Sequence, residues 1–272
     1  MSSIEATNQS IPEGTANLSY TSLLQFRAWL VGVVVVCAVF ALQPFYPSLI
    51  GPLSNVLPTL LVGNAFVSCL FCLKKYGLRL RTRFDLVWPL FTVGFCVWVV
   101  AEATWAFYYF VLQIVVPYPS IADIFYTSGY FPVIAGAAIY LDTFRVAISR
   151  RRLIVAVAAT GLALALCLSF VVPIELAANP ALTRMLTDLS YPILDLILVS
   201  LAIFGLVIFH GGRMARWWLL FGGAACMYVI GDELFLYQTS IGTYYNGGID
   251  DLIFLIGYLT FALAFFSHRK EL

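Results

Sequence analysis

Long apolar stretches separated by short polar segments run along almost the whole chain. A helix needs about 20 mostly apolar residues to cross the hydrocarbon core of a bilayer. Eight stretches meet this length, at about 26–45, 54–73, 85–115, 120–141, 152–173, 188–210, 214–238 and 250–267. The pattern predicts an all-α integral membrane protein whose eight transmembrane helices form a single domain, 26–267.

Both ends of the chain are polar. Residues 1–25 lack the basic start and cleavage site of a secretory signal, so we expect a disordered cytoplasmic tail there. Residues 268–272 are expected to form a second, short cytoplasmic tail. The stretch 85–115 is longer than a membrane requires, which predicts a tilted or projecting helix that ends before Pro117.

Basic residues predict the orientation of the helices. Fourteen of the 15 lie at the start of the first stretch, after the last, or in segments 74–83, 145–152 and 213–216, and only Arg184 lies on the opposite side. Short loops rich in Lys and Arg remain in the cytoplasm. Both termini are therefore predicted to be cytoplasmic, in a multi-pass protein of the cell membrane.

The composition agrees with burial in lipid. The 272 residues are 62% hydrophobic and 11% charged, whereas a soluble domain is about a quarter charged. The surplus apolar surface is expected to contact membrane lipids. A net charge of +1 provides no basic field for nucleic acid, so no nucleic-acid partner is expected.

Segments of the chain also resemble one another. Residues 83–102, shifted by 130, share six identities with 213–232, and Glu102 falls on Asp232. At an offset of 128 the identical pairs include Asp123/Asp251, Gly129/Gly257 and Tyr130/Tyr258. We therefore expect the eight transmembrane helices to be built from repeated helical hairpins, with units at about 83–141, 152–210 and 213–267.

Acidic residues gather on the side opposite the basic loops. Nine of the 14 lie there or in the outer half of the helices: Glu102, Asp123, Glu175, Asp188, Asp195, Asp232, Glu233, Asp250 and Asp251. An ionised carboxylate in hydrocarbon costs about 2.5–3.5 kcal/mol on insertion scales. These groups are therefore expected to face the bundle interior or a wet cavity, with Glu102, Asp195 and Asp232 deepest.

Helical spacing places aromatic side chains beside these acids. Trp98, Glu102 and Trp105 share one stripe, and Asp123 shares another with its following tyrosines. Convergence of the stripes would form an outward-opening pocket. Its expected ligand-binding residues are Glu102, Asp232, Asp123, Asp195, Asp251, Tyr126, Tyr130 and Tyr258. Such a pocket suits a small cation, or protons because burial favours neutral carboxyl groups, with Arg184 gating or neutralising the entrance.

The same residues also have structural explanations. Asp123, Asp188 and Asp251 begin their predicted helices, where aspartate commonly caps free N–H groups. Aromatic residues near a membrane face usually form an interfacial belt, an interpretation that covers Tyr118, Tyr244, Tyr245, Trp29, Trp217 and Trp218. Glu102 and Asp232 begin no helix and recur at matched positions, which favours a ligand role over a structural Tyr–carboxylate hydrogen bond.

Enzyme and cofactor chemistry has little support in the sequence. All six cysteines lie in apolar stretches, and both histidines sit at helix ends beside arginines, which does not fit bis-histidine haem or three-histidine zinc sites. We expect no cofactor, no metal site and no catalytic residue. A membrane enzyme that uses paired carboxylates for acid–base chemistry is a minor alternative, because no nucleophile accompanies them.

Three stretches resemble a family of microbial membrane regions. They are Tyr118-Pro-Ser-Ile-Ala-Asp123-Ile-Phe-Tyr126 with Gly129-Tyr130, Asp188-Leu-Ser-Tyr-Pro-Ile-Leu-Asp195, and Asp250-Asp-Leu-Ile-Phe-Leu-Ile-Gly-Tyr258. Over roughly 83–267 the chain is similar to the sensor regions that precede diguanylate cyclase, phosphodiesterase or histidine kinase domains. The resemblance implies signal transduction but no particular ligand. Because the sequence ends at Leu272, we expect a free-standing member that acts through a membrane or cytoplasmic signalling partner.

The sequence thus predicts a non-enzymatic, sensor-like membrane protein that binds a small ligand, such as a cation, or protons. A proton- or cation-coupled transporter is the alternative, although no predicted helix is broken at mid-membrane and the cytoplasmic half lacks a polar path. A scaffold, in which the acids serve only as caps and packing bonds, is a further alternative.

Overall fold

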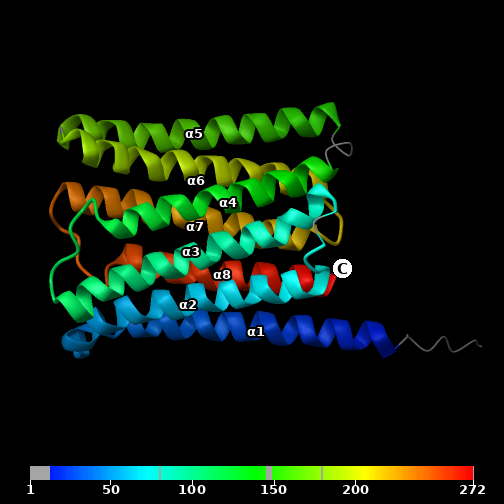
Figure 1. The fold of residues 1–272 in the computed structure, drawn as a ribbon, viewed down its shortest axis with the longest axis horizontal. Coiled ribbons are helices and arrows are strands. Elements are labelled where there is room, and N and C mark those ends of the chain that lie inside the picture. The colour runs from blue at the N-terminus through cyan, green and yellow to red at the C-terminus, as the bar shows by residue number, and fades with distance from the viewer. Residues whose placement is uncertain (1–12, 80, 145–148, 179, 272) are drawn as a thin grey trace, which may run out of the picture.

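Six long helices form a closed ring in the computed structural model, which describes residues 13–79, 81–144, 149–178 and 180–271 (Figure 1). The eight helices are α1 (Glu13–Ala41), α2 (Pro47–Tyr76), α3 (Val87–Phe107), α4 (Ile121–Phe144), α5 (Arg150–Ala178), α6 (Leu182–Phe209), α7 (Ala215–Ser240) and α8 (Ile249–Glu271). The order around the ring is α2, α3, α4, α6, α7 and α8, which contacts α2 again. Outside the ring, α1 packs against α8 and α5 against α6.

Each of these eight helices contains a segment long and apolar enough to cross a membrane, within the part of the chain that the structure describes. The eight predicted stretches correspond to them one for one. Successive helices run in opposite directions, so the loops fall at two ends of the bundle (Figure 1). We name the end with the α3–α4 and α7–α8 loops, on the left in Figure 1, the acidic end, and the opposite one the basic end.

The two ends of the chain are more helical than expected. Helix α1 begins at Glu13 rather than near residue 26, and α8 continues to Glu271 through the predicted tail. Extending an existing helix adds a hydrogen bond per residue without a new nucleation step, so polar flanks adopt the conformation of the apolar segment beside them. Residues 1–12, Arg145 and the side chain of Glu175 lie outside the described residues.

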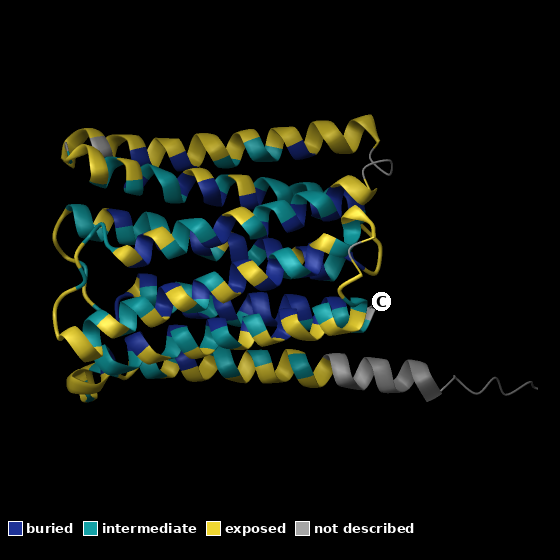
Figure 2. Ribbon diagram, in the orientation of Figure 1, coloured by how far each residue is buried: buried dark blue, intermediate teal, exposed yellow. Residues whose placement is uncertain are grey.

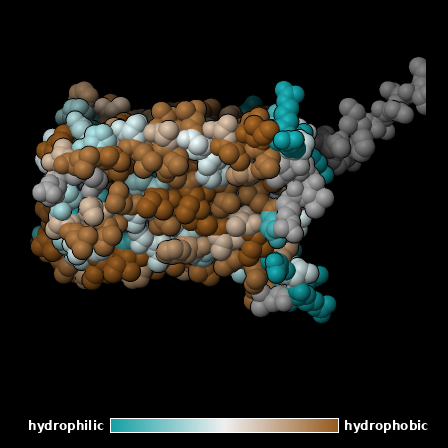
Figure 3. Space-filling model, turned by 90° about the horizontal axis from the view of Figure 1, so that it is seen from above, coloured by the Kyte–Doolittle hydropathy of each residue, from teal (hydrophilic) through white to brown (hydrophobic). Residues whose placement is uncertain are grey.

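The surface is apolar along the bundle and charged at the basic end (Figure 3). Helices α1 and α5 are mostly exposed (Figure 2), with large apolar side chains such as Val34 and Leu162 at 58% and 62% exposure. The basic residues of the α2–α3 and α6–α7 loops lie at the basic end. Among the described basic residues only Arg184, in the first turn of α6, lies near the acidic end.

Aromatic side chains fill the ring in its basic half. Trp88 of α3 and Trp217 and Trp218 of α7 are almost fully buried, at 1%, 0% and 0% exposure. The expectation that Trp217 and Trp218 belong to an interfacial belt is therefore wrong. A position near a predicted helix end gives the depth of a residue along the bundle, but the rotation of the helix decides whether it faces lipid or the core.

His268 of α8 is fully buried in the same aromatic cluster rather than lying in a tail. Its Nδ1 atom lies 3.3 Å from the Tyr76 hydroxyl of α2, and its Nε2 atom lies 3.1 Å from the Tyr140 hydroxyl of α4. The imidazole ring lies 4.5 Å from the Trp88 ring, centroid to centroid. His268 thus joins three helices of the ring at the basic end.

A glycine lets α6 approach α7 closely at this level. A Cβ atom at Gly205 would overlap the ring of Trp218. The ring cannot move aside easily, because Phe209 stacks on it with centroids 6.2 Å apart and Trp217 contacts it at 4.3 Å. By contrast, a Cβ atom at Gly223 of α7 would meet nothing within 4 Å.

We therefore expect Gly205→Ala to destabilise the protein by about 1–3 kcal/mol through overpacking. Thermal unfolding of detergent-purified protein should show this as a lower Tm. Gly223→Ala is the matched control and should leave Tm equal or higher, because alanine favours a helix over glycine by about 1 kcal/mol. Equal Tm values for the Gly205→Ala variant and the wild type would contradict the packing of Trp218 against α6.

Candidate functional site

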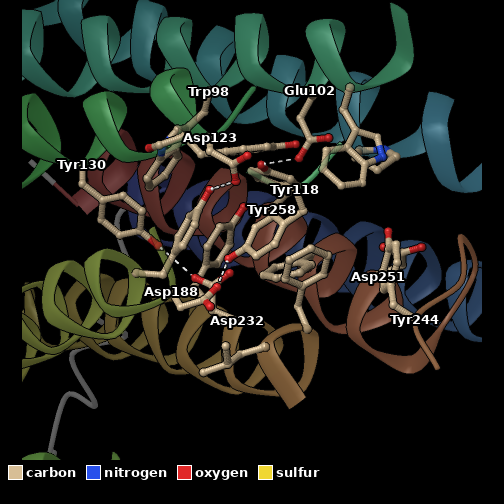
Figure 4. Close-up of a pocket in the computed structure, with 18 of the residues that line it drawn as sticks. Trp98, Glu102, Tyr118, Asp123, Tyr130, Asp188, Asp232, Tyr244, Asp251 and Tyr258 are labelled. Carbon is tan, nitrogen blue, oxygen red and sulfur yellow. Dashed lines mark hydrogen bonds between the residues drawn. The ribbon is translucent and has the colours of Figure 1, made fainter. Parts of the chain in front are cut away.

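A cavity lies inside the ring at the acidic end, and we name it the chamber (Figure 4). Its volume accessible to the centre of a water molecule is about 90 Å³. All six ring helices contribute to its wall. The carboxyl groups on the wall are those of Glu102, Asp123, Asp188, Asp232 and Asp251. The aromatic residues are Trp98, Trp105, Tyr118, Tyr126, Tyr130, Tyr191, Tyr228, Phe235, Tyr244, Phe254 and Tyr258.

The structure brings the predicted site residues together. Those that line the chamber are Glu102, Asp123, Tyr126, Tyr130, Asp232, Asp251 and Tyr258. Asp195 is the exception, because it lies behind the wall at 1% exposure and accepts a hydrogen bond from the wall residue Tyr130. The helical stripes therefore converge, with one carboxyl group set back from the cavity.

Tyrosine hydroxyls donate to the deepest carboxyl groups (Figure 4). The Tyr258 hydroxyl of α8 donates to Glu102 of α3 over 2.7 Å. The Tyr130 hydroxyl of α4 lies 2.6 Å from Asp195 of α6 and 3.4 Å from Asp232 of α7. Each of the helix pairs α3–α4 and α7–α8 thus supplies a tyrosine hydroxyl to a carboxyl group of the other pair.

Asp195 and Asp232 meet at one donor, because the Tyr130 hydroxyl lies within hydrogen-bonding distance of both carboxyl groups. An ionised carboxylate can only accept hydrogen bonds, so the two groups compete for this single hydroxyl in the wall of the chamber.

Asp123 and Asp251 hold the starts of two helices and also face the chamber. Asp123 accepts the Ser120 backbone N–H over 2.6 Å and the Tyr191 hydroxyl over 2.7 Å. Asp251 accepts the Gly247 backbone N–H over 2.6 Å. The expected capping role is confirmed for both residues. The same carboxyl groups are part of the chamber wall, so capping and exposure to the cavity coexist.

Asp188 is not a helix cap, because α6 begins six residues earlier at Leu182. It accepts the Tyr118 hydroxyl over 2.5 Å and lies 3.4 Å from the Arg184 side chain. The Arg184 guanidinium also lies 5.7 Å from the centre of the Tyr118 ring. Burial, together with the nearby Asp188 carboxylate, raises the pKa of Tyr118 well above its ordinary range, so its hydroxyl stays protonated and donates.

The floor of the chamber, toward the basic end, is a stacked aromatic pair. The rings of Trp98 and Tyr228 lie 5.6 Å apart at an angle of 14°. The indole N–H of Trp98 donates to the Tyr126 carbonyl over 2.9 Å. Beyond them the ring is filled by the aromatic cluster described above. The chamber is therefore closed toward the basic end.

Several wall residues were not among the predicted ligand-binding residues. Tyr118 and Tyr244 were expected in an interfacial belt, yet both line the chamber. They lie in the loops between helices, where no periodic pattern exists to assign a face. Tyr191 and Phe235 share helical stripes with the acids of α6 and α7, as their spacing in the sequence predicts, and both line the chamber.

The carboxyl groups are distributed around the wall rather than gathered at one point. Among the described residues, no three His, Cys, Asp or Glu side chains are placed to hold one metal ion together.

Removal of the tyrosine hydroxyl that donates to Glu102 should lower the stability of the protein. We expect Tyr258→Phe to destabilise the protein by about 1.5–3 kcal/mol, because Glu102 loses a hydrogen bond in a buried position. Thermal unfolding in detergent measures the change, with Tyr237→Phe, at a residue 44% exposed, as the control. The double variant Tyr258→Phe/Glu102→Gln should lose less stability than the sum of the losses in the two single variants. Full additivity would mean that the two side chains do not interact.

No protein-family model matches the chain, and neither does any curated protein or solved structure. The chemistry of the chamber is therefore inferred from its own charges, walls and dimensions.

Proposed function

We propose that the chain is a multi-pass membrane protein whose chamber binds a small organic cation, and that it acts as a non-enzymatic sensor. One observation carries the proposal: five carboxyl groups line the chamber, while no Lys, Arg or His is among the described residues on its wall. Arg184 reaches Asp188 from outside that wall. The enclosed charge is therefore unbalanced.

Unbalanced charge in an apolar bundle needs compensation. A buried ionised group is costly unless an opposite charge or hydrogen bonds accompany it. Tyrosine hydroxyls satisfy part of four of the five carboxyl groups, and a backbone N–H satisfies part of Asp251, but none of these donors adds positive charge. A cation supplies it, and aromatic faces such as those of Trp98 and Tyr228 attract cations as well. Protons are the competing occupant, since they neutralise the same groups.

The proposed membrane orientation follows from the two ends of the bundle. The clustered basic residues favour a cytoplasmic location for the basic end, and therefore for both termini. The chamber would then open toward the outside, where a sensor meets its ligand. The apolar flanks of α1 and α5 agree with contact to membrane lipids.

We also propose that the chain contains an internal duplication. The ring order places α2, α3 and α4 in the same sequence as α6, α7 and α8. The hydrogen bonds follow the same pattern, because Tyr258 of α8 donates to Glu102 of α3 and Tyr130 of α4 lies within reach of Asp232 of α7. These features favour a two-fold relation between α2–α4 and α6–α8 around an axis along the bundle, each set containing one of the matched hairpins, 83–141 and 213–267, expected from the sequence.

Closure of the chamber toward the basic end favours sensing over transport. Transport needs access from both sides, whereas stacked and buried aromatic residues occupy the half below Trp98 and Tyr228. A sensor needs only to bind and change the balance between conformations. The resemblance to sensor regions of microbial signalling proteins supports the same function, with the basic end facing a membrane or cytoplasmic signalling partner.

The orientation can be measured by cysteine labelling with a membrane-impermeant maleimide. Thr243→Cys, in the exposed α7–α8 loop, should be labelled in intact cells. Ser149→Cys, exposed at the start of α5, should be labelled only after the membrane is opened. The wild-type chain is the control for its own cysteines. The reverse labelling pattern would place the chamber on the cytoplasmic side.

Cation binding can be measured as thermal stabilisation of the purified protein by methylamine and tetramethylammonium. A ligand present at about 100 times its Kd stabilises a protein by about 2.7 kcal/mol. Glu102→Gln and Asp232→Asn should each reduce the shift, whereas Asp142→Asn, an exposed site at the basic end, is the matched control and should keep it.

The same experiment separates the alternatives. A Tm that depends on pH but not on either cation would indicate that the chamber binds protons. Equal cation-induced Tm shifts in all three variants would show that the cation does not bind in the chamber. In proteoliposomes a bound amine should not accumulate. Accumulation that depends on Asp232 would identify a transporter instead.

A further inference from the structure

A second cavity adjoins the chamber at the acidic end, and we name it the vestibule. Its volume accessible to the centre of a water molecule is about 750 Å³, against about 90 Å³ for the chamber. It lies among the α3–α4 loop, the α7–α8 loop and the start of α6. The two cavities share four wall residues: Trp105, Tyr118, Phe235 and Tyr244.

These four residues form an aromatic neck between the cavities. The Phe235 ring is central, with its centroid 4.8 Å from Tyr244, 5.2 Å from Tyr118 and 6.3 Å from Trp105. All three contacts are edge-to-face, at interplanar angles of 72–76°. Such a neck offers ring faces and edges to a ligand that passes through it, which suits an apolar group and tolerates a cation.

Charge divides between the two cavities. The chamber wall carries five carboxyl groups. In the vestibule, Arg184 is the one charged side chain among the described wall residues, and its neighbours include Ile114, Val115 and Tyr245. Asp188 and the Tyr118 ring hold Arg184 at the border of the neck. The path from outside to inside therefore runs from an apolar, positively charged space to a negatively charged one.

We propose that the ligand of the chamber is an amphipathic monoamine. Its single ammonium group enters the chamber, and its uncharged apolar body crosses the aromatic neck into the vestibule. This inference rests on the proposed function and specifies the class of cation. The length of the body is set by the neck and the vestibule, which the chamber alone does not determine.

Arg184 excludes the main competitor, a linear diamine. A second ammonium at the far end of the ligand would lie in the vestibule, beside a guanidinium and among apolar side chains. Like charges repel in such an environment. Asp188 is already paired with Arg184, and the other carboxyl groups of the chamber wall do not reach the vestibule. The methyl group at the far end of a monoamine would lie against the same apolar side chains, and this burial of apolar surface is favourable.

Binding of a short amine series to wild-type protein in zwitterionic lipid nanodiscs tests the proposal. The probes are methylamine, n-butylamine, n-hexylamine and 1,6-diaminohexane, followed by tryptophan fluorescence because Trp105 lines both cavities. Affinity should rise roughly two- to fourfold per methylene from butylamine to hexylamine, as apolar surface is buried. The diamine should bind at least about tenfold more weakly than hexylamine, the factor that corresponds to a 1.4 kcal/mol penalty.

Two variants of Arg184 identify the source of this discrimination. Arg184→Gln should raise the affinity for 1,6-diaminohexane relative to hexylamine, whereas Arg184→Lys, which retains the charge, should keep the wild-type ratio. Empty nanodiscs correct for partition of hexylamine into lipid. Glu102→Gln should weaken every amine in the series together, since the ammonium site is common to all of them.

The outcomes distinguish this inference from the function on which it rests. If methylamine binds but longer chains bind no more tightly, or the diamine binds as well as hexylamine, the amphipathic monoamine is wrong and the cation-binding chamber stands. If no amine in the series binds, the proposed function itself is wrong. A rising series with a weak diamine, reversed in Arg184→Gln, supports both.

Discussion

A carboxyl group enclosed among apolar helices must keep hydrogen-bond donors or lose its charge, and the acidic end depends on this constraint. Glu102 is satisfied by Tyr258, Asp123 by Tyr191 and Asp188 by Tyr118. In each case the tyrosine comes from a different helix than the acid or from a loop, so the same bonds tie the bundle together. The chamber is the space that remains between these bonded pairs, which is why its wall is both acidic and aromatic.

The two halves of the bundle have different chemistry along one axis. The basic half is a packed aromatic cluster in which His268 joins three helices through two tyrosine hydroxyls. The acidic half contains the cavities, and its chamber touches all six ring helices. A ligand in the chamber would therefore contact all six ring helices at one end, while aromatic packing joins ring helices at the other. This division favours the proposed sensor over a passage through the bundle.

Much of this organisation could be predicted from residues alone, although not all of it. The stripe Trp98–Glu102–Trp105 and the matched positions Glu102 and Asp232 correctly indicated which faces meet. Tyr118 and Tyr244 could not be assigned, because loop residues follow no helical period. Trp217 was assigned to lipid although it is fully buried, since an aromatic residue near a helix end has the same local pattern in either position.

The length of the apolar stretches and the distribution of basic residues were sufficient to predict eight helices and their alternating directions. These properties are local, because each residue adds a constant rise along a helix. The rotation of each helix about its axis is not local. It placed Asp195 behind Tyr130 and paired Tyr258 with Glu102, contacts between residues 65 and 156 positions apart in the chain. Such contacts depend on how six helices close into a ring, and no spacing within one helix specifies that closure.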